Sequence, residues 1–393
     1  MVVYVAATLI SCLLGWQATR TDRYRILWCI AAALPLALVS ALRWGVGTDM
    51  FYLYLPQFRA VEWMSGGGGA DLARECFQPL IDGGVIHRSM SALFGDPMAL
   101  AEVYWHGFSL EEPGYRALVW TIVRCGGSFH WFTVLTSFAT AALVFAAIWR
   151  QSKAPVLAIY FYVATSNYFL SLNIVRQYLA VALVLLAVTF AVDRRFWRFA
   201  LCVAVAALFH RSAVLALSVW FLPKLRLRPI AGFALVGLGC LASLYAAPFL
   251  RTVLPQIGLG IYVKYFDAGF SKDGFEWMFF AINIAFMVMG TWYYARAGSR
   301  NRCFAVWYWM TVLGTVALTF SGTVPLMKRV NYYFAAPQFL MLPEMLMAEG
   351  NRRLRRWLVV LAVLAFAAET AVAVALMNKN EPLPYRILPG GSF

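Results

Sequence analysis

The sequence predicts an all-α, polytopic integral membrane protein, and three observations support this fold class. Apolar residues make up 62% of the 393 positions, charged residues only 13%, and the mean hydropathy is +0.69. A soluble domain would carry roughly twice that share of charged residues. The apolar residues also form runs of membrane-spanning length, separated by short basic clusters. We therefore expect one polytopic membrane domain over 1–393.

About ten full transmembrane helices are expected, because runs of roughly 17–25 apolar residues can cross the hydrocarbon core. These runs lie near 2–17, 24–42, 131–149, 155–171, 175–192, 230–250, 277–295, 303–321, 332–349 and 357–377. Six basic clusters between them hold 18 of the 33 lysines and arginines. The positive-inside rule assigns these clusters to the cytoplasmic face. They are Arg20/Arg23/Arg25, Arg150/Lys153, Arg194/Arg195/Arg198, Lys224/Arg226/Arg228, Arg296/Arg300/Arg302 and Arg352/Arg353/Arg355/Arg356. The net charge of +15 follows from this arrangement, so no nucleic-acid partner is expected.

The segment 199–222 is expected to form a re-entrant hairpin of two half-length helices. The basic clusters on either side of it are both predicted to be cytoplasmic, yet only about 24 apolar residues separate them. That length is too short for two full crossings at 1.5 Å per residue. The tip would fall at Phe209-His210-Arg211-Ser212, and non-helical backbone at such a depth requires protein or a water-filled cavity around it.

The longest segment on the opposite side, 43–130, is predicted to form an extracytoplasmic cap. Within it, Tyr52, Tyr54, Phe58 and Trp63 are typical of a helix that lies on the membrane surface rather than crossing it. Cys76 and Cys125 could either form a disulfide or remain free thiols.

Several short motifs lie on this same predicted outer side. They are Arg43-x-x-x-Gly47-Thr48-Asp49, Glu112-x-Gly114-Tyr115, Asn173-x-x-Arg176-Gln177-x-x-Ala180, Phe209-His210-x-Ser212-Ala213 and Arg329-x-x-Tyr332-Tyr333-Phe334. In this order the motifs resemble the EpsG family, relatives of the Wzy polymerases that join polysaccharide repeat units. The resemblance extends from about Arg43 to Phe334, with a departure in the loop around Tyr262 and Tyr265.

The resemblance implies a glycosyltransferase of the bacterial inner membrane, with its active site facing the periplasm or the cell exterior. It would transfer repeat units between polyprenyl-diphosphate-linked oligosaccharides, the donor and the acceptor, to build exopolysaccharide, capsule or O-antigen. Membrane lipids, and other polysaccharide assembly and chain-length proteins, are the remaining expected partners. No cofactor is expected, and the lack of an Asp-x-Asp pair favours a reaction without a metal ion.

Chemistry suggests a role for each candidate residue. Guanidinium groups bind phosphate oxygens bidentately and stay charged, so the expected diphosphate-binding residues are Arg43, Arg176, Arg329 and Lys328. A general base must take the proton of the acceptor hydroxyl, and the candidates are His210, Asp49 and Glu112. The expected substrate-binding residues are Asn173, Gln177, Tyr115, Arg211, Ser212, Tyr332 and Tyr333.

Other interpretations remain open at this point. Arg43 and Arg176 flank membrane spans and could simply reach the lipid headgroups. His210 could be a structural histidine, and Asp49 and Glu112 could cap helices. Among functions, a membrane O-acyltransferase would also need a histidine in the membrane, but the inner loops offer it almost no acids or histidines. A flippase for lipid-linked oligosaccharide would need charges along both halves of a central cavity.

Overall fold

The computed structural model describes residues 1–82, 96–225, 227–256, 263, 274–297 and 302–387, and these residues are almost entirely helical. The fold class predicted from composition is therefore confirmed: the chain is an all-α polytopic membrane protein. Arg226, Arg300, Tyr262 and Tyr265, which entered the sequence predictions, lie outside the described residues.

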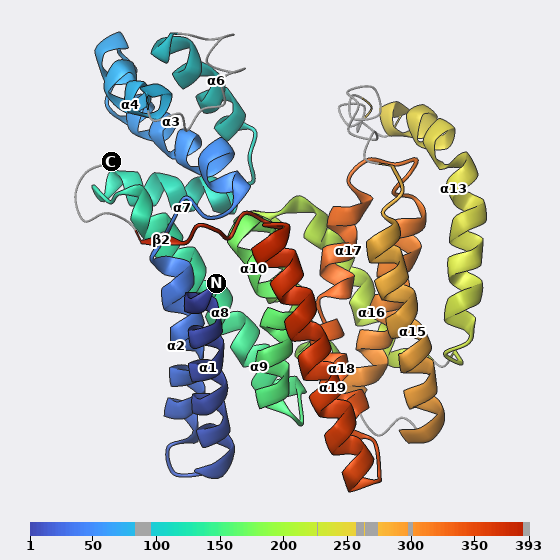
Figure 1. Ribbon diagram of the computed structural model, residues 1–393. Helices are drawn as coiled ribbons and strands as arrows, with labels where there is room; N and C mark the ends of the chain where they lie inside the picture. Colours follow the sequence, from blue (N-terminus) through green and yellow to red (C-terminus); the bar gives the residue numbers. More distant parts are fainter. Residues whose placement is uncertain (83–95, 226, 257–262, 264–273, 298–301, 388–393) are drawn as a thin grey trace.

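Figure 1 shows the helices of the described residues in chain order. The first half contains α1 (Val2–Arg20), α2 (Arg25–Ala41), η1 (Met50–Tyr54), α3 (Leu55–Ser65), α4 (Ala70–Asp82), α6 (Pro97–Ser109), α7 (Pro113–Arg124), α8 (Phe129–Gln151), α9 (Pro155–Ala164), α10 (Asn167–Asn173) and α11 (Val175–Val192). The second half contains α12 (Phe196–Phe209), η2 (Arg211–Trp220), η3 (Leu222–Lys224), α13 (Ala231–Gln256), α15 (Trp277–Ala297), α16 (Arg302–Thr319), α17 (Met327–Ala335), α18 (Gln338–Met347), α19 (Arg352–Ala371) and η6 (Val372–Leu376).

The expected ten full spans are too many. By length and hydropathy, the described residues contain six helices able to cross a membrane, or seven if the bent pair α9 and α10 counts as one span. Of the remaining predicted spans, 303–321 corresponds to α16, which has 18 residues and is not among these six, and two others are too short or divided. The helix α2 has only 17 residues, and the run 332–349 is divided into α17 and α18 at Ala336-Pro337. The pair α9 and α10 bends by 53° at Thr165-Ser166, where Ser166 has a left-handed backbone with φ of 60°.

Figure 1 shows α3, α4 and α6, from the segment 43–130, grouped beyond one end of the bundle, and we call this group the cap. Its extracytoplasmic location stays a prediction. The residues around it form a second hydrophobic core beside that of the bundle. Tyr54, Phe58 and Trp63 are 1–3% exposed within this core, whereas Tyr52 is 47% exposed. The prediction of a membrane-surface helix is therefore wrong for the three buried residues, because their rings face the interior of the cap. Cys76 and Cys125 are both free thiols.

The start of α1 and the last described residues lie at the end of the bundle that bears the cap. A short antiparallel pair joins β1 (Arg43–Trp44) to β2 (Arg386–Ile387), with Arg43 opposite Ile387. The hydroxyl of Tyr4 donates a hydrogen bond to the Pro382 carbonyl at 2.8 Å, so the start of α1 lies beside the same C-terminal segment. Figure 1 shows this segment passing over the bundle below the cap.

The chain reverses at His210, within the hairpin predicted for 199–222. The helix α12 ends at Phe209, His210 is extended with φ of −157°, and the 3₁₀ helix η2 begins at Arg211. At the open end, the rings of Phe196 and Trp220 lie 5.1 Å apart, so the two helices run side by side in opposite directions. This reversal places His210, Arg211 and Ser212 at the tip of the pair. The depth of the tip in the membrane stays a prediction.

Candidate functional site: a carboxylate, arginine and histidine cluster

Glu112 reaches the tip of the hairpin because α7 begins very close to the end of α12. A Cβ atom on Gly114 would lie 2.7 Å from the Leu208 carbonyl oxygen, so only glycine allows this approach. Glu112 precedes Pro113, the first residue of α7, but its side chain makes no helix-capping hydrogen bond. The capping interpretation of Glu112 is thus not supported, since its carboxylate points to other groups.

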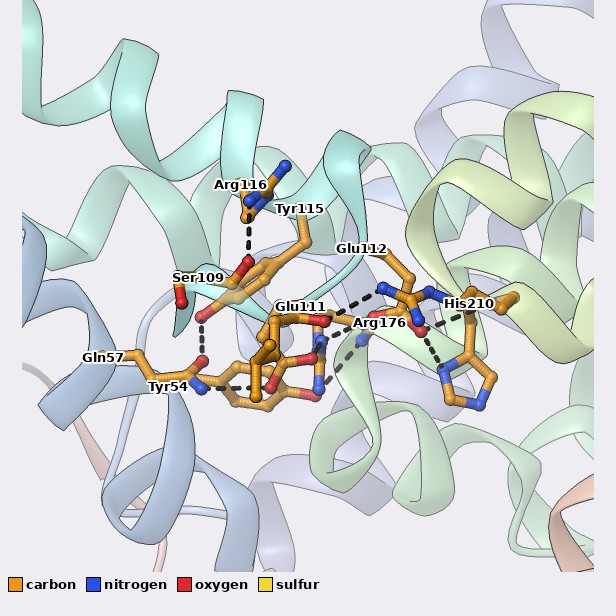
Figure 2. Close-up of polar contacts among 11 residues, drawn as sticks. Tyr54, Gln57, Ser109, Glu111, Glu112, Tyr115, Arg116, Arg176 and His210 are labelled. Atoms are coloured by element: carbon orange, nitrogen blue, oxygen red, sulfur yellow. Dashed lines mark hydrogen bonds and ion pairs between the residues drawn. The ribbon is translucent and has the colours of Figure 1, made fainter. Parts of the chain in front are cut away.

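Arg176, in the first turn of α11, occupies the centre of the cluster (Figure 2). Its Nη1 atom donates to Glu112 Oε2 at 2.9 Å and also to Glu111 Oε2. The guanidinium lies over the ring of Tyr115, with Cζ 4.6 Å from the ring centroid. Only 12% of the side chain is exposed, so Arg176 does not extend toward lipid headgroups. Both carboxylates bind the same nitrogen of the guanidinium, Nη1.

Gln57 connects this arginine network to the cap. The Tyr115 hydroxyl donates to Gln57 Oε1 at 3.0 Å, and Gln57 Nε2 donates to Glu111 Oε1 at 3.0 Å. Tyr54 completes the support, because its hydroxyl accepts a hydrogen bond from the Arg176 backbone N–H at 3.3 Å. Tyr115 is only 1% exposed. It therefore supports Arg176 from beneath and has no surface to offer a sugar ring.

His210 and Arg211 contact the second oxygen of Glu112. The His210 Nδ1 atom lies 3.4 Å from Glu112 Oε1, an ion-pair distance that is long for a hydrogen bond. The Arg211 backbone N–H donates to the same oxygen at 3.3 Å. Burial alone would raise the pKa of Glu112, but His210 and the Arg176 charge outweigh it and lower that pKa to about 2. Glu112 is therefore ionised at neutral pH.

The helix α17 closes the cluster on the other side of His210. The rings of His210 and Tyr333 are stacked, with centroids 6.5 Å apart and planes 22° apart. The Ser212 hydroxyl donates to the Tyr333 hydroxyl at 3.4 Å. Gln177 Nε2 donates to the backbone carbonyl of Arg329 at 2.6 Å. Three motifs that are distant in the sequence, on α11, the hairpin and α17, thus meet at one place.

Arg329 and Asp49 lie at the edge of this cluster. The Arg329 side chain is exposed and has no hydrogen bond or ion pair with the described residues. The Asp49 backbone N–H donates to Asn173 Oδ1 at 3.0 Å, while its carboxylate has no partner in the described part of the chain. Burial raises the pKa of Asp49, although the charges of Arg329 and Arg176 oppose this effect. Asp49 caps no backbone N–H with its side chain, so its carboxylate remains available.

Arg43 stands apart from the cluster, in the interior, with 2% of its surface exposed. Its Nη1 atom donates to the Ser40 hydroxyl at 2.9 Å, to the Ser137 hydroxyl at 3.1 Å and to the Ser40 carbonyl, and Nη2 donates to the Leu172 carbonyl at 3.4 Å. These bonds hold α2, α8 and α10 together. The structure thus gives Arg43 internal partners instead of the open surface that a diphosphate would need.

Lys328 and Tyr332 are on the opposite face of α17, away from His210. Lys328 Nζ lies 2.9 Å from Glu276 Oε1, and both Lys328 and Tyr332 line a cavity between α15 and α19. Within the described residues, no group of three or more His, Cys, Asp or Glu side chains could hold a metal ion.

Sequence reasoning missed three members of the network, namely Glu111, Gln57 and Tyr54. Glu111 carried a signal, since it is adjacent to Glu112 immediately before Pro113. The sequence around Gln57 and Tyr54 did not indicate a role in this network, because their contacts with Arg176 and Tyr115 depend on how the cap folds back onto α7.

Comparison with known proteins identifies one family. The EpsG family matches residues 26–387, a longer stretch than the motifs themselves cover. No curated protein and no solved structure matches the chain. Since the family match spans nearly the whole chain, the protein belongs to the EpsG family, a family of Wzy-like polymerases.

Proposed function

We propose that the protein is an extracytoplasmic glycosyltransferase that polymerises polyprenyl-diphosphate-linked repeat units into exopolysaccharide, capsule or O-antigen. The family match indicates a Wzy-like polymerase in exopolysaccharide synthesis. The observation that carries the finer proposal is the Arg176–Glu112–His210 cluster next to the exposed Arg329. It combines a pair of groups suited to proton transfer with unpaired positive charge for a diphosphate.

Arg329 and Arg211 bind the diphosphate in this proposal. Both are exposed, and neither is paired with a carboxylate within the described residues, so their full charge is available to phosphate oxygens. Arg176 has a supporting role. Glu111 and Glu112 already neutralise its charge.

His210 is proposed as the general base, with Glu112 as its orienting partner. An ionised Glu112 favours the tautomer with a proton on Nδ1, which leaves Nε2 free to accept one. The acceptor hydroxyl would transfer its proton to Nε2 while its oxygen forms a bond to the anomeric carbon of the donor sugar. The bond between that carbon and the diphosphate oxygen breaks, and the diphosphate leaves with both bonding electrons. Arginine side chains stabilise the negative charge that develops on it.

Asp49 is the alternative base. Its carboxylate is unpaired, and its raised pKa makes it a stronger base than a free aspartate. Ser212 and Tyr333, at the His210 end, are the remaining candidates for contact with sugar. Gln177 and Asn173 instead position neighbouring backbone groups, those of Arg329 and Asp49.

The direct test is complementation of a deletion strain. The wild-type gene should restore long polymer, whereas His210→Gln should leave single lipid-linked repeats at normal protein abundance. Turnover by His210→Ala should fall by about 10²–10⁴-fold, the usual contribution of a general base. Asp49→Asn is the matched comparison, because it also removes a base without changing size.

The outcomes of this comparison differ clearly. If Asp49→Asn abolishes polymer and His210→Gln retains it, Asp49 is the base and His210 is structural. If the deletion strain itself still makes full-length polymer, the polymerase proposal is wrong.

A further inference from the structure

A cavity of about 500 Å³ lies on the side of α17 that faces away from His210. The helices α15, α17 and α19 form its walls, together with the break between α9 and α10 and the C-terminal residues Lys379 and Asn380. Both α15 and α19 are long and apolar enough to cross a membrane. The cavity therefore extends along the membrane-spanning part of the protein.

Most of the wall is apolar. Met278, Ile282 and Met289 contribute from α15, and Phe366 contributes from α19. Several of these side chains are partly exposed, with 42% for Ile282 and 51% for Met278. An opening of this kind between membrane helices would be filled by a hydrocarbon chain, since water gains little from such a surface.

Two ammonium groups lie at one end of the cavity, together with two carboxylates. The ammonium groups of Lys328 and Lys379 lie 4.9 Å and 5.1 Å from the centroid of the same Phe279 ring. Glu276 pairs with Lys328 at 2.9 Å. Lys379, in contrast, has no ion pair within the described part of the chain, and burial lowers its pKa. Glu369 also lines the cavity, but at a distance beyond an ion pair.

This combination of an apolar channel with an incompletely neutralised ammonium at its end fits an anionic lipid. The headgroup would pair with Lys379 and share the Lys328 charge, and the chain would lie along Ile282 and Met289. A phosphate group beside two ammonium groups forms charge-assisted hydrogen bonds, which are stronger than neutral ones.

The helix α17 separates this cavity from the arginine cluster. Lys328, Asn331, Tyr332 and Ala335 line the cavity and recur at helical spacing on one face. Arg329 and Tyr333 lie on the other side, toward Gln177 and His210. Two phosphate-binding places would therefore lie on opposite sides of one helix, with Lys328 and Arg329 as neighbours in its first turn.

We propose that this cavity is a second lipid site, which holds the polyprenyl chain and diphosphate of one of the two substrates. The identity of the ligand rests on the proposed function, because transfer between two lipid-linked chains requires two such places. The existence of an anionic-lipid site rests on the cavity alone.

The test uses purified full-length protein in nanodiscs of phosphatidylethanolamine and phosphatidylglycerol. The probe is a polyprenyl diphosphate with a photoreactive diazirine near the end of its chain, and labelled peptides are identified by mass spectrometry. We expect labelling of α15 around Ile282, with competition by unlabelled polyprenyl diphosphate. Ile282→Trp fills the channel and Lys379→Gln removes the charge, so each should reduce labelling about tenfold.

Leu244→Trp is the control, since Leu244 is 69% exposed on α13 and lies outside the cavity lining. It should leave the labelling of α15 unchanged. Lys379→Gln provides a second variant if the tryptophan at 282 prevents folding. Labelling that neither variant reduces, or equal competition by added phosphatidylglycerol, would overturn the assignment.

Chain extension, measured on the same samples, separates the two proposals. Labelling of α15 without any extension of lipid-linked repeats would reject the polymerase proposal and retain the lipid site. Extension by the wild type, with labelling insensitive to both variants, would reject the lipid site and retain the polymerase.

Discussion

Replacing Arg176 by glutamine should destabilise the protein, because the change removes a counter-charge that binds both Glu111 and Glu112. Their side chains are 19% and 10% exposed, so neither carboxylate is well hydrated once its partner is lost. Breaking a buried ion pair costs about 3–5 kcal/mol. Both carboxylates are partly exposed, and Glu111 keeps its hydrogen bond from Gln57, so we expect a loss of stability at the lower end of this range, about 3 kcal/mol.

A second substitution separates stability from catalysis. In Arg176→Gln combined with Glu111→Gln, one uncompensated carboxylate is removed, and about half of the lost stability should return. Turnover should stay low if Arg176 acts on the substrate or holds Glu112 against His210. Glu111 is suited to this comparison, because it binds Arg176 without touching His210.

Arg329→Gln is the matched control. Arg329 is exposed and without an ion pair in the described part of the chain, so its loss should change stability by less than about 0.5 kcal/mol. Turnover should nevertheless fall, since this guanidinium is the one most available to a diphosphate. Thermal unfolding in nanodiscs, followed by tryptophan fluorescence, and polymer length measure the two quantities. Arg176→Gln with wild-type stability and wild-type polymer length would refute this reading of the cluster.

Two further predictions concern the approach of Glu112 to His210. Gly114→Ala should lower the free energy of unfolding by about 1–3 kcal/mol and should also lower the polymer yield, because its Cβ would lie 2.7 Å from the Leu208 carbonyl oxygen. Gly69→Ala is the control for both assays, since a Cβ there meets no atom within 4 Å. Folding lowers the pKa of Glu112 from 4.5 to about 2, so the ionised Glu112 should stabilise the folded protein by about 3 kcal/mol. This stabilisation should be complete above pH 4.5 and should disappear as the pH falls toward 2. Unfolding midpoints across this range should fall less steeply in Glu112→Gln than in the wild type; equal slopes would contradict the assignment.

The sequence predicted the parts of the site that depend on local pattern. Glu112, Arg176, His210 and Tyr333 were selected from separate short motifs, and the structure brings them into contact. The reversal at His210 was also predictable, because two basic clusters flanked a stretch too short for two crossings. In each case a local signal limited where the chain could turn.

Features that depend on packing could not be predicted in this way. The rings of Phe58 and Trp63 suggested a membrane surface, yet an amphipathic helix fits equally well over the core of a cap. The run 332–349 was apolar enough to suggest one span, although it breaks at Ala336-Pro337. The sequence did not indicate a role for Lys379, because its position beside Phe279 depends on the C-terminal segment folding back toward α15.

The candidate cations show why charge alone is a weak guide to a diphosphate site. From the sequence, Arg43, Arg176 and Arg329 were all expected to bind the diphosphate, since each lay in a short motif on the same predicted side of the membrane. The structure separates them by their partners. Hydroxyl and carbonyl groups surround Arg43 in the interior, and two carboxylates cancel the charge of Arg176.

A diphosphate that approached Arg176 would meet the repulsion of Glu111 and Glu112 together with the attraction of the guanidinium. At Arg329 and Arg211 no carboxylate within the described residues is paired with the guanidinium, so each can attract an anion. The charge of Arg176 instead helps to keep Glu112 ionised beside His210. In the proposed mechanism, Arg176 therefore acts on the carboxylate beside the base, while Arg329 and Arg211 bind the leaving diphosphate.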